Sequence, residues 1–328
     1  MSGAQASVLD VRGLNVWFDL GRGRELHAVR GIDVRLGAGE RMGLVGESGC
    51  GKTTAILAMM GLLPPSASVA GEVRIGGEDL LAGGEERMRA HRWKDVAMVF
   101  QGAMNAFNPV RTIGKQLVEP MELHGVARGR AARTRAGELL ELVGIAAGRA
   151  DRYPHEFSGG MRQRAAIAMA LACGPRVLLA DEPTTALDVM VQAQILELLV
   201  RLTEELGLAL VLVTHDLPLV AQTCPRAAVM YAGQIAELGS TDELYHAPRH
   251  PYTRLLFSAT PALEEQDEAV ISIPGAPPRL DRELVGCPFA PRCDRVFEPC
   301  PVEDPRLIEV GERHVAACHL NTRAAAAR

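Results

Sequence analysis

The sequence lacks an apolar run long enough to cross a membrane. A spanning helix needs about 20 predominantly apolar residues, and the longest candidate, residues 165–173, is ended by Gly174, Pro175 and Arg176. Residues 1–10 also lack the basic start and apolar centre of a secretion signal. We therefore expect an intracellular protein that reaches a membrane only through a partner.

The chain also carries no net positive charge. The net charge is −5 at pH 7, which leaves no basic footprint for nucleic acid. Internal repeats are absent, and this excludes a tandem duplication of one module. With 328 residues, 48% of them hydrophobic, the chain can form one large or two modest domains with an ample core.

A phosphate-binding pattern is the strongest feature that is present. Residues 46–53 match G-x-x-x-x-G-K-[ST] at every position, between a predicted strand over 41–45 and a predicted helix over 54–63. The glycines allow backbone N–H groups to face a phosphate, and the helix N-terminus adds its dipole. Lys52 would reach the β- and γ-phosphates, and Thr53 would ligate Mg²⁺. The sequence predicts an ATP-type site of Gly46, Glu47, Ser48, Gly49, Cys50, Gly51, Lys52, Thr53 and Thr54.

A second predicted strand, over residues 177–181, ends in two adjacent carboxylates. This is the Walker B arrangement, in which Asp181 holds Mg²⁺ through its water shell and Glu182 polarises the attacking water. A strand followed by a solvated acidic turn is the alternative, and Pro183 would suit it.

A third motif opens a long Ala-rich helix. Ser158 is a natural N-cap, and Gly159 and Gly160 leave bare N–H groups for an anion. One nucleotide cannot easily reach both this helix and the first loop on a single chain. The arrangement resembles the ABC ATPase family, in which the signature motif of one protomer closes on the ATP held by the other.

The resemblance assigns roles to further residues. Gln101, after a predicted strand over 96–100, would contact Mg²⁺ and the lytic water. Asp188 belongs to the loop that crosses the dimer interface, and His215 resembles the histidine that contacts the γ-phosphate. Phe18 occupies the position of the aromatic ring that stacks on adenine, although its neighbour Trp17 could face the base instead.

Two residues depart from the family pattern. Cys50 replaces a common serine, and Met161 replaces a common glutamine. Cys50 would contribute its backbone N–H, and its position beside Lys52 predicts partial thiolate character. Since Lys52, Glu182 and His215 are present, the resemblance implies an ATPase that hydrolyses ATP.

The resemblance implies an α/β fold, a P-loop ABC nucleotide-binding domain. Its RecA-like parallel-sheet core would carry antiparallel β and helical subdomains. We expect the cassette over residues 1–245, with the helical subdomain over about 102–170 and predicted helices over 113–123 and 131–143. A Cys-rich extension would follow over residues 246–328.

The extension narrows the resemblance. Residues 101–116, 250–256, 273–278 and 286–293 resemble segments of the dipeptide/oligopeptide and nickel permease ATPases. This implies a subunit that lies at the cytoplasmic face of the membrane and powers the import of di- or oligopeptides. Its implied partners are a second, similar ATPase subunit or a second copy, two integral permease subunits and, indirectly, a solute-binding protein. A short permease helix would dock between the Gln101 loop and the helical subdomain.

The sequence leaves other functions open. The same machinery could import nickel or another small solute, since a cassette does not fix the cargo. A non-transport ABC ATPase acting on DNA or ribosomes is disfavoured, because too few residues separate Lys52 from Asp181 for a long coiled coil. A regulatory module that binds ATP without turnover is disfavoured by the presence of Glu182 and His215.

Four late cysteines, with the spacing C-x5-C-x6-C-x17-C, lie in a segment too short and Pro-rich for a core of its own: Cys287, Cys293, Cys300 and Cys318. A reducing cytosol disfavours disulfides, and zinc usually takes closer cysteine pairs. Four thiolates suit a [4Fe-4S] cluster, and some relatives with this extension carry one at these positions. Zn²⁺, with His314 or His319 replacing a cysteine, and free buried thiols are the alternatives.

Overall fold

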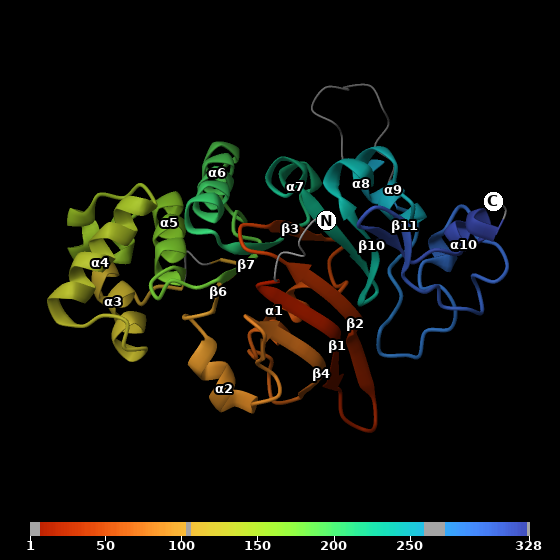
Figure 1. The fold of residues 1–328 in the computed structure, drawn as a ribbon, viewed down its shortest axis with the longest axis horizontal. Helices are drawn as coiled ribbons and strands as arrows, with labels where there is room; N and C mark the ends of the chain where they lie inside the picture. The colour runs from red at the N-terminus through yellow and green to blue at the C-terminus, as the bar shows by residue number, and fades with distance from the viewer. Residues whose placement is uncertain (1–6, 103–105, 259–272, 327–328) are drawn as a thin grey trace, which may run out of the picture. The chain divides into compact units, whose positions relative to one another are not determined.

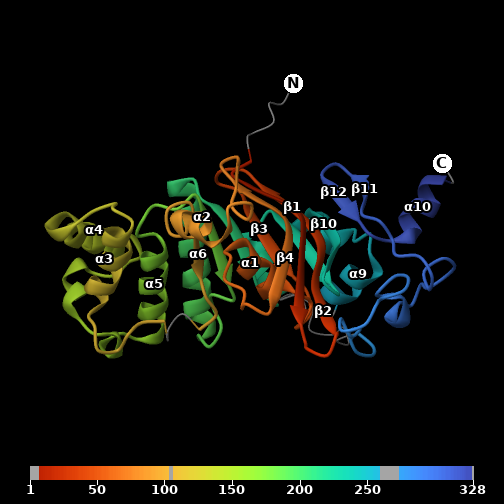
Figure 2. The ribbon, with the colours of Figure 1, turned by 90° about the horizontal axis from the view of Figure 1, so that it is seen from below.

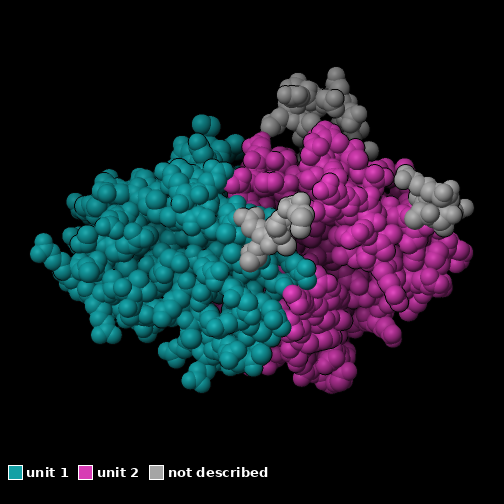
Figure 3. Space-filling model, in the orientation of Figure 1, with its two compact units in different colours: residues 1–10, 35–40, 73–212 teal, residues 11–34, 41–72, 213–328 magenta. Residues whose placement is uncertain are grey.

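The computed structural model describes residues 7–102, 106–258 and 273–326. The chain divides into two compact units, coloured separately in Figure 3. Unit 1 comprises residues 1–10, 35–40 and 73–212, and unit 2 comprises residues 11–34, 41–72 and 213–328. Each unit collects distant parts of the sequence.

The sheet strands of unit 1 are fully buried. Their order is β8-β7-β6, and their bounds are Val96–Val99 for β6, Val177–Asp181 for β7 and Ala209–Val213 for β8. β6 and β7 run parallel, with Val96 opposite Val177. Burial along whole strands is typical of a parallel sheet covered on both faces. Parallel pairing also brings the carboxyl ends of β6 and β7 to one edge.

Helices make up most of the rest of unit 1, and three of them gather in a group in Figure 1. This group consists of α3 (Ile113–Leu123), α4 (Gly129–Leu142) and α5 (Gly159–Ala170). The structure therefore confirms the two helices predicted over residues 113–123 and 131–143. Unit 1 also contains β5 (Glu78–Asp79), which pairs with the end of β4 (Ala67–Ile75), and the helices α2 (Gly84–His91) and α6 (Val189–Leu206). Two short 3-10 helices, η2 (Ala147–Asp151) and η3 (Pro154–Glu156), lie between α4 and α5.

The sheet strands of unit 2 come from both ends of the chain. Their order is β11-β12-β10-β9-β3, with bounds Arg41–Val45 for β3, Arg226–Tyr231 for β9, Gln234–Ser240 for β10, Ile308–Gly311 for β11 and His314–Ala316 for β12. β3 and β9 run parallel, and the other pairs are antiparallel. Residues 308–316 thus add two strands to the edge of this sheet.

Three further strands of unit 2 lie side by side in the order β2-β1-β4, as Figure 2 shows. They are β1 (Leu9–Asp19), β2 (Glu25–Leu36) and β4 (Ala67–Ile75). Its helices are α1 (Lys52–Met59), α7 (Leu217–Thr223), α8 (Thr241–His246), α9 (Pro251–Ser258) and α10 (His319–Ala326). Among the described residues, no helix has the length and apolar character of a membrane span.

A buried carboxylate joins the extension to strand β10. Glu237 has no exposed surface, and its Oε1 accepts from the backbone N–H of Arg249 at 2.7 Å and lies 2.7 Å from Nε2 of His314. Its Oε2 accepts from the backbone N–H of His250 at 2.9 Å. These contacts link β10 to the start of α9 and to β12.

We expect Glu237→Gln to destabilise the protein. An amide has one acceptor oxygen where the carboxylate has two, so one buried donor would lose its partner at a cost of about 1–3 kcal/mol. Denaturant unfolding measures the free energy of unfolding. Glu312→Gln, in the exposed turn between β11 and β12, is the matched control. Equal stability of the two variants would contradict the prediction.

Candidate functional site

The predicted phosphate-binding loop lies in unit 2, between β3 and α1. α1 begins at Lys52 and ends at Met59, earlier than the predicted end at residue 63. Gly61 follows with φ 58°, and a left-handed glycine is a common helix terminator. The strand, loop and helix are otherwise present where the sequence places them.

Two glycines of the loop are pressed against neighbouring backbone. A Cβ atom on Gly46 would lie 2.2 Å from the carbonyl oxygen of Met230 in β9, and one on Gly51 would lie 2.5 Å from that of Ala28 in β2. Both residues also have positive φ angles, 146° and 107°. No side chain fits at either position.

The Lys52 side chain curls over the loop. It is 7% exposed, and its Nζ donates to the carbonyl oxygens of Gly46 at 2.7 Å and Glu47 at 3.0 Å. An ammonium has three donors, so a bound anion would compete with these carbonyls for it. The positive charge is therefore already held at the loop.

Cys50 does not have the thiolate character that its sequence position predicts. The side chain is 5% exposed, and burial raises the pKa of the thiol, outweighing the opposite effect of Lys52. That prediction is wrong because it considered the neighbouring charge and not the desolvation.

Two residues from the C-terminal part of the chain contact Glu47 in the loop. The Glu47 carboxylate pairs with Arg292, and the Glu47 N–H donates to the Tyr252 hydroxyl at 2.9 Å. Sequence reasoning did not identify Arg292 or Tyr252 as site residues. Their only signal was that both lie in segments that resemble the permease ATPases.

In unit 1, the structure brings Gln101 and Glu182 together. Gln101 Nε2 donates to Glu182 Oε2 at 2.8 Å, and the Thr185 hydroxyl donates to the same oxygen at 3.0 Å. Glu182 adopts φ 43°, while Asp181, at the end of β7, is 2% exposed. Asp181 thus offers a buried carboxylate suited to a cation, and the neighbouring Glu182 offers a half-buried carboxylate that water can reach.

The predicted signature residues lie at the start of α5. Ser158 is its N-cap, and its Oγ accepts from the Met161 N–H at 3.3 Å. A Cβ on Gly160 would lie 2.7 Å from Val191 of α6. Asp188 in turn caps α6 by accepting from the Val191 N–H at 3.0 Å. The starts of the two helices therefore lie side by side.

The remaining nucleotide-site candidates lie in unit 2. His215 is exposed and lies between the end of β8 and Asp216, the N-cap of α7. Trp17 stacks on His27, with ring centroids 4.7 Å apart. Successive strand side chains point to opposite faces, so Phe18, which is half-buried, lies on the other face of β1.

The four late cysteines share one neighbourhood in unit 2. Burial raises the pKa of Cys287 to about 12, with Cys300 and Cys318 adding to the shift. Burial likewise raises the pKa of Cys318 to about 11, with further contributions from Cys293 and Cys300. The Cys287 N–H also donates to the Cys300 carbonyl at 2.8 Å. All four cysteines are therefore electrostatic neighbours, and none forms a disulfide.

Both histidines proposed as zinc ligands contact other groups through Nε2. His314 Nε2 contacts Glu237, and His319 Nε2 contacts the Glu303 carbonyl at 2.9 Å. In the part of the chain that the structure describes, no group of three or more His, Cys, Asp or Glu side chains could hold a metal ion.

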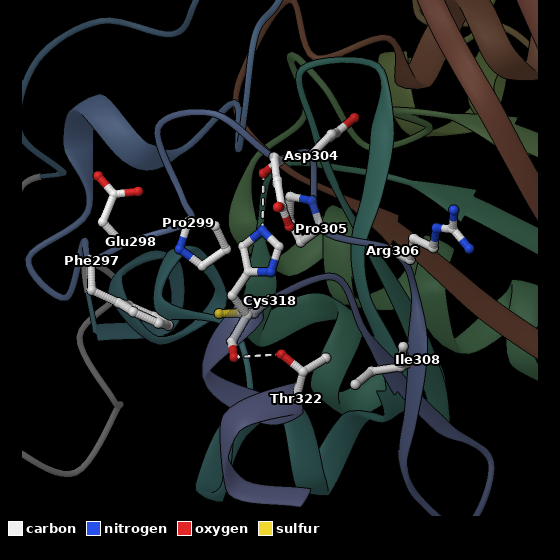
Figure 4. Close-up of a pocket in the computed structure, with 11 residues that line it drawn as sticks. Phe297, Glu298, Pro299, Asp304, Pro305, Arg306, Ile308, Cys318 and Thr322 are labelled. Carbon is white, nitrogen blue, oxygen red and sulfur yellow. Dashed lines mark hydrogen bonds between the residues drawn. The ribbon is translucent and has the colours of Figure 1, made fainter. Parts of the chain in front are cut away.

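A hollow of about 810 Å³ lies beside Cys318, and Figure 4 shows this cysteine among the residues that line it. Its lining includes Cys318 and His319 together with the acidic residues Glu298, Glu303 and Asp304. It lies wholly within the extension. None of the predicted nucleotide-site residues lines it.

The comparisons with known proteins agree with this geometry, and the fold and site define an ABC-type ATPase cassette. The family model described as "ABC transporter" matches residues 29–185, and the one described as "Oligopeptide/dipeptide transporter, C-terminal region" matches residues 236–300. Two solved dimeric structures of the cassette MJ0796, one bound to ADP and Pi, are 28% and 29% identical. Their TM-scores are 0.63 and 0.62, and each match covers 71% of this chain and 98% of the other.

Curated relatives resemble the chain over almost its whole length. A probable peptide ABC transporter ATP-binding protein of Sinorhizobium fredii is 46% identical, over 95% of this chain and 94% of that protein. The oligopeptide transport ATP-binding protein OppD of Bacillus subtilis is 44% identical, over 94% and 87%. The chain belongs to the family of ABC transporter ATP-binding proteins that carry the oligopeptide/dipeptide C-terminal region.

We expect Gly46→Ala to abolish MgATP binding. The added methyl would meet the Met230 carbonyl and force a left-handed backbone on a residue with a Cβ, which would displace the loop. Gly148→Ala, where φ is ordinary and the space is open, is the matched control. Equilibrium binding of a fluorescent ATP analogue measures the effect, and normal binding by the Gly46 variant would contradict this account.

Proposed function

We propose that this chain is the ATP-hydrolysing subunit of a membrane ABC importer whose cargo is di- or oligopeptides. The observation that carries the proposal is the likeness over some 95% of the chain to a protein named for peptide transport. The oligopeptide/dipeptide C-terminal match supports the same cargo class. Nickel or another small solute is the alternative cargo, because the cassette chemistry is the same for each.

We assign the nucleotide chemistry to residues in three roles. Glu182 is the general base, His215 contacts the γ-phosphate, and Gln101 orients water and magnesium. The contact between Gln101 and Glu182 supports a shared task for these two side chains. Thr53, Gln101 and Asp181 serve Mg²⁺. ATP is bound by Phe18, Gly46, Glu47, Ser48, Gly49, Cys50, Gly51, Lys52, Thr53 and Thr54.

ATP lies, on this proposal, between the P-loop of one cassette and the signature of another. Ser158, Gly159, Gly160 and Asp188 then serve the nucleotide of the partner chain. Val189 and Met190, beside Asp188, are 79% and 72% exposed, which supports a surface that a partner covers. The partner is a similar, distinct ATPase subunit, with a second copy of this chain as the alternative.

The subunit works at the cytoplasmic face of the membrane, with two integral permease subunits and, indirectly, a solute-binding protein. A permease helix docks beside the Gln101 loop, where Phe100 and Val110 are 43% and 78% exposed. The cassette ends near residue 245 and contains the helical subdomain over about 102–170. Residues 246–328 form the extension.

The four cysteines hold a [4Fe-4S] cluster in this proposal. Each corner iron of a cluster takes one thiolate, so the sulfurs stand farther apart than four ligands on a single zinc ion. The four cysteines influence one another's pKa, which supports their serving one shared group. When bound, the cluster would cross-link the four segments that carry the cysteines. Zn²⁺ remains the alternative.

The transport function is tested by purifying the chain with its native permease and measuring ATP hydrolysis. We expect stimulation by peptides presented by the cognate binding protein, and none by Ni²⁺. Glu182→Gln should keep MgATP binding but lower hydrolysis by about 10²- to 10⁴-fold, because it keeps the shape and loses the base. Stimulation by Ni²⁺ alone would reassign the cargo, and full turnover by the variant would remove Glu182 from its role.

Anaerobically purified protein should be brown, with visible absorbance that dithionite bleaches. Cys293→Ser should lose iron and colour, because one corner of the cluster has no thiolate, while Cys173→Ser, outside the extension, should keep both. Iron and zinc analysis measures the content. A colourless protein with stoichiometric zinc would replace the cluster by the alternative metal.

A further inference from the structure

We infer that Arg292 and Tyr252 are positioning residues for the phosphate-binding loop, and that the C-terminal extension sets the affinity for MgATP through them. The contact point is Glu47, which sequence reasoning valued only as part of the loop backbone. The inference rests on the nucleotide-binding role proposed for this loop. It adds a task for the extension within the same chain.

The Glu47 side chain is held by two parallel hydrogen bonds. Arg292 Nη1 donates to Oε2 at 2.6 Å, and Nη2 donates to Oε1 at 3.0 Å. This paired geometry is the strong form of an ion pair and fixes direction as well as distance. The two residues are 245 positions apart in the sequence. The pair therefore fixes a loop residue to a distant segment.

The guanidinium of Arg292 cannot easily turn elsewhere. Its side chain is 4% exposed, against 25% for Glu47. Its other donors reach the carbonyl oxygens of Pro274 at 2.7 Å and Ile273 at 3.4 Å, and the Tyr231 hydroxyl at 3.3 Å. Since a guanidinium has five N–H donors, these bonds and the Glu47 pair use them all.

Tyr252 holds the backbone of the same loop residue. It has no exposed surface, and its hydroxyl accepts from the Glu47 N–H at 2.9 Å. Its ring packs against Tyr231 and Phe289, with centroids 4.6 Å and 5.4 Å away. A buried aromatic cluster thus fixes the acceptor, so the N–H of Glu47 is positioned by the extension.

Glu47 links the extension to the phosphate-binding ammonium. Its side chain is held by Arg292, its N–H by Tyr252, and its carbonyl accepts from Lys52 Nζ at 3.0 Å. A shift of Glu47 would therefore move an acceptor of Lys52. This gives the extension a direct physical route to nucleotide affinity, without a side chain that touches the nucleotide.

The same route leads back to the cysteine segment. Arg292 ends the short helix η4 (Ala290–Arg292), which Cys287 and Cys293 flank. The Ala290 N–H donates to the Cys287 carbonyl at 2.9 Å, and the Cys293 N–H donates to the Ala290 carbonyl at 3.3 Å. Coupling between two sites is reciprocal, so MgATP binding should stabilise the backbone of this segment.

Equilibrium binding of MgATP to the full chain tests the inference. Arg292→Gln should raise the Kd roughly 5- to 150-fold, the usual range for coupled sites. Arg292→Lys should fall between, since it keeps the charge and loses the paired geometry, and Tyr252→Phe should raise the Kd without removing the ring. Arg279→Gln is the matched control, because this arginine of the extension pairs with Asp281 at an exposed site.

Two further measurements separate positioning from general destabilisation. In a double-mutant cycle, Glu47→Gln combined with Arg292→Gln should weaken binding no more than either change alone. Amide exchange over residues 286–301 should slow when MgATP binds to the wild type and change little in Tyr252→Phe.

The binding measurements distinguish a failure of this inference from a failure of the proposed nucleotide site. An unchanged Kd for Arg292→Gln would overturn the inference. If that variant does not fold, an unchanged Kd for both Tyr252→Phe and Glu47→Gln would overturn it. Lys52→Ala should lose binding in either case. Normal binding by Lys52→Ala would instead remove the nucleotide site itself.

Discussion

The buried carboxylate of Glu237 is the interaction on which the arrangement of unit 2 depends. A charge without exposed surface is tolerated only when donors surround it, and here two backbone N–H groups and the His314 ring do so. All three come from the chain beyond β10. The strand can therefore bury this residue only if the start of α9 and strand β12 are in place, which makes the extension a part of the fold.

Anchored in this way, the extension also reaches the opposite end of the chain. α9 follows directly from the segment that bonds to Glu237 and carries Tyr252, which contacts the loop after β3. The loop is also held by the turn between β9 and β10, where the Gly233 N–H donates to the Cys50 carbonyl at 3.0 Å. The backbone of this loop is thus supported by two separate segments of unit 2.

Local features of the site could be predicted from the sequence, because they depend on neighbours within a few positions. The glycine-rich loop, the helix that follows it and the Ser158 cap are of this kind. The pairing of Glu47 with Arg292 could not be predicted, because no periodicity or spacing connects residues so far apart. The predicted thiolate character of Cys50 was wrong for a related reason. Its sequence neighbour Lys52 lowers the pKa of the thiol, but the larger effect is burial, which only the folded chain shows.

The strands added by the extension also solve a problem of sheet edges. Without β12, strand β10 would present a row of unpaired backbone groups, and such an edge is a template for pairing between molecules. β12 covers part of β10, and the outermost strand β11 has only four residues and is partly exposed. The outermost strand of this sheet is therefore β11, with four residues, rather than β10, with seven, which leaves fewer backbone groups open to unintended pairing with another molecule.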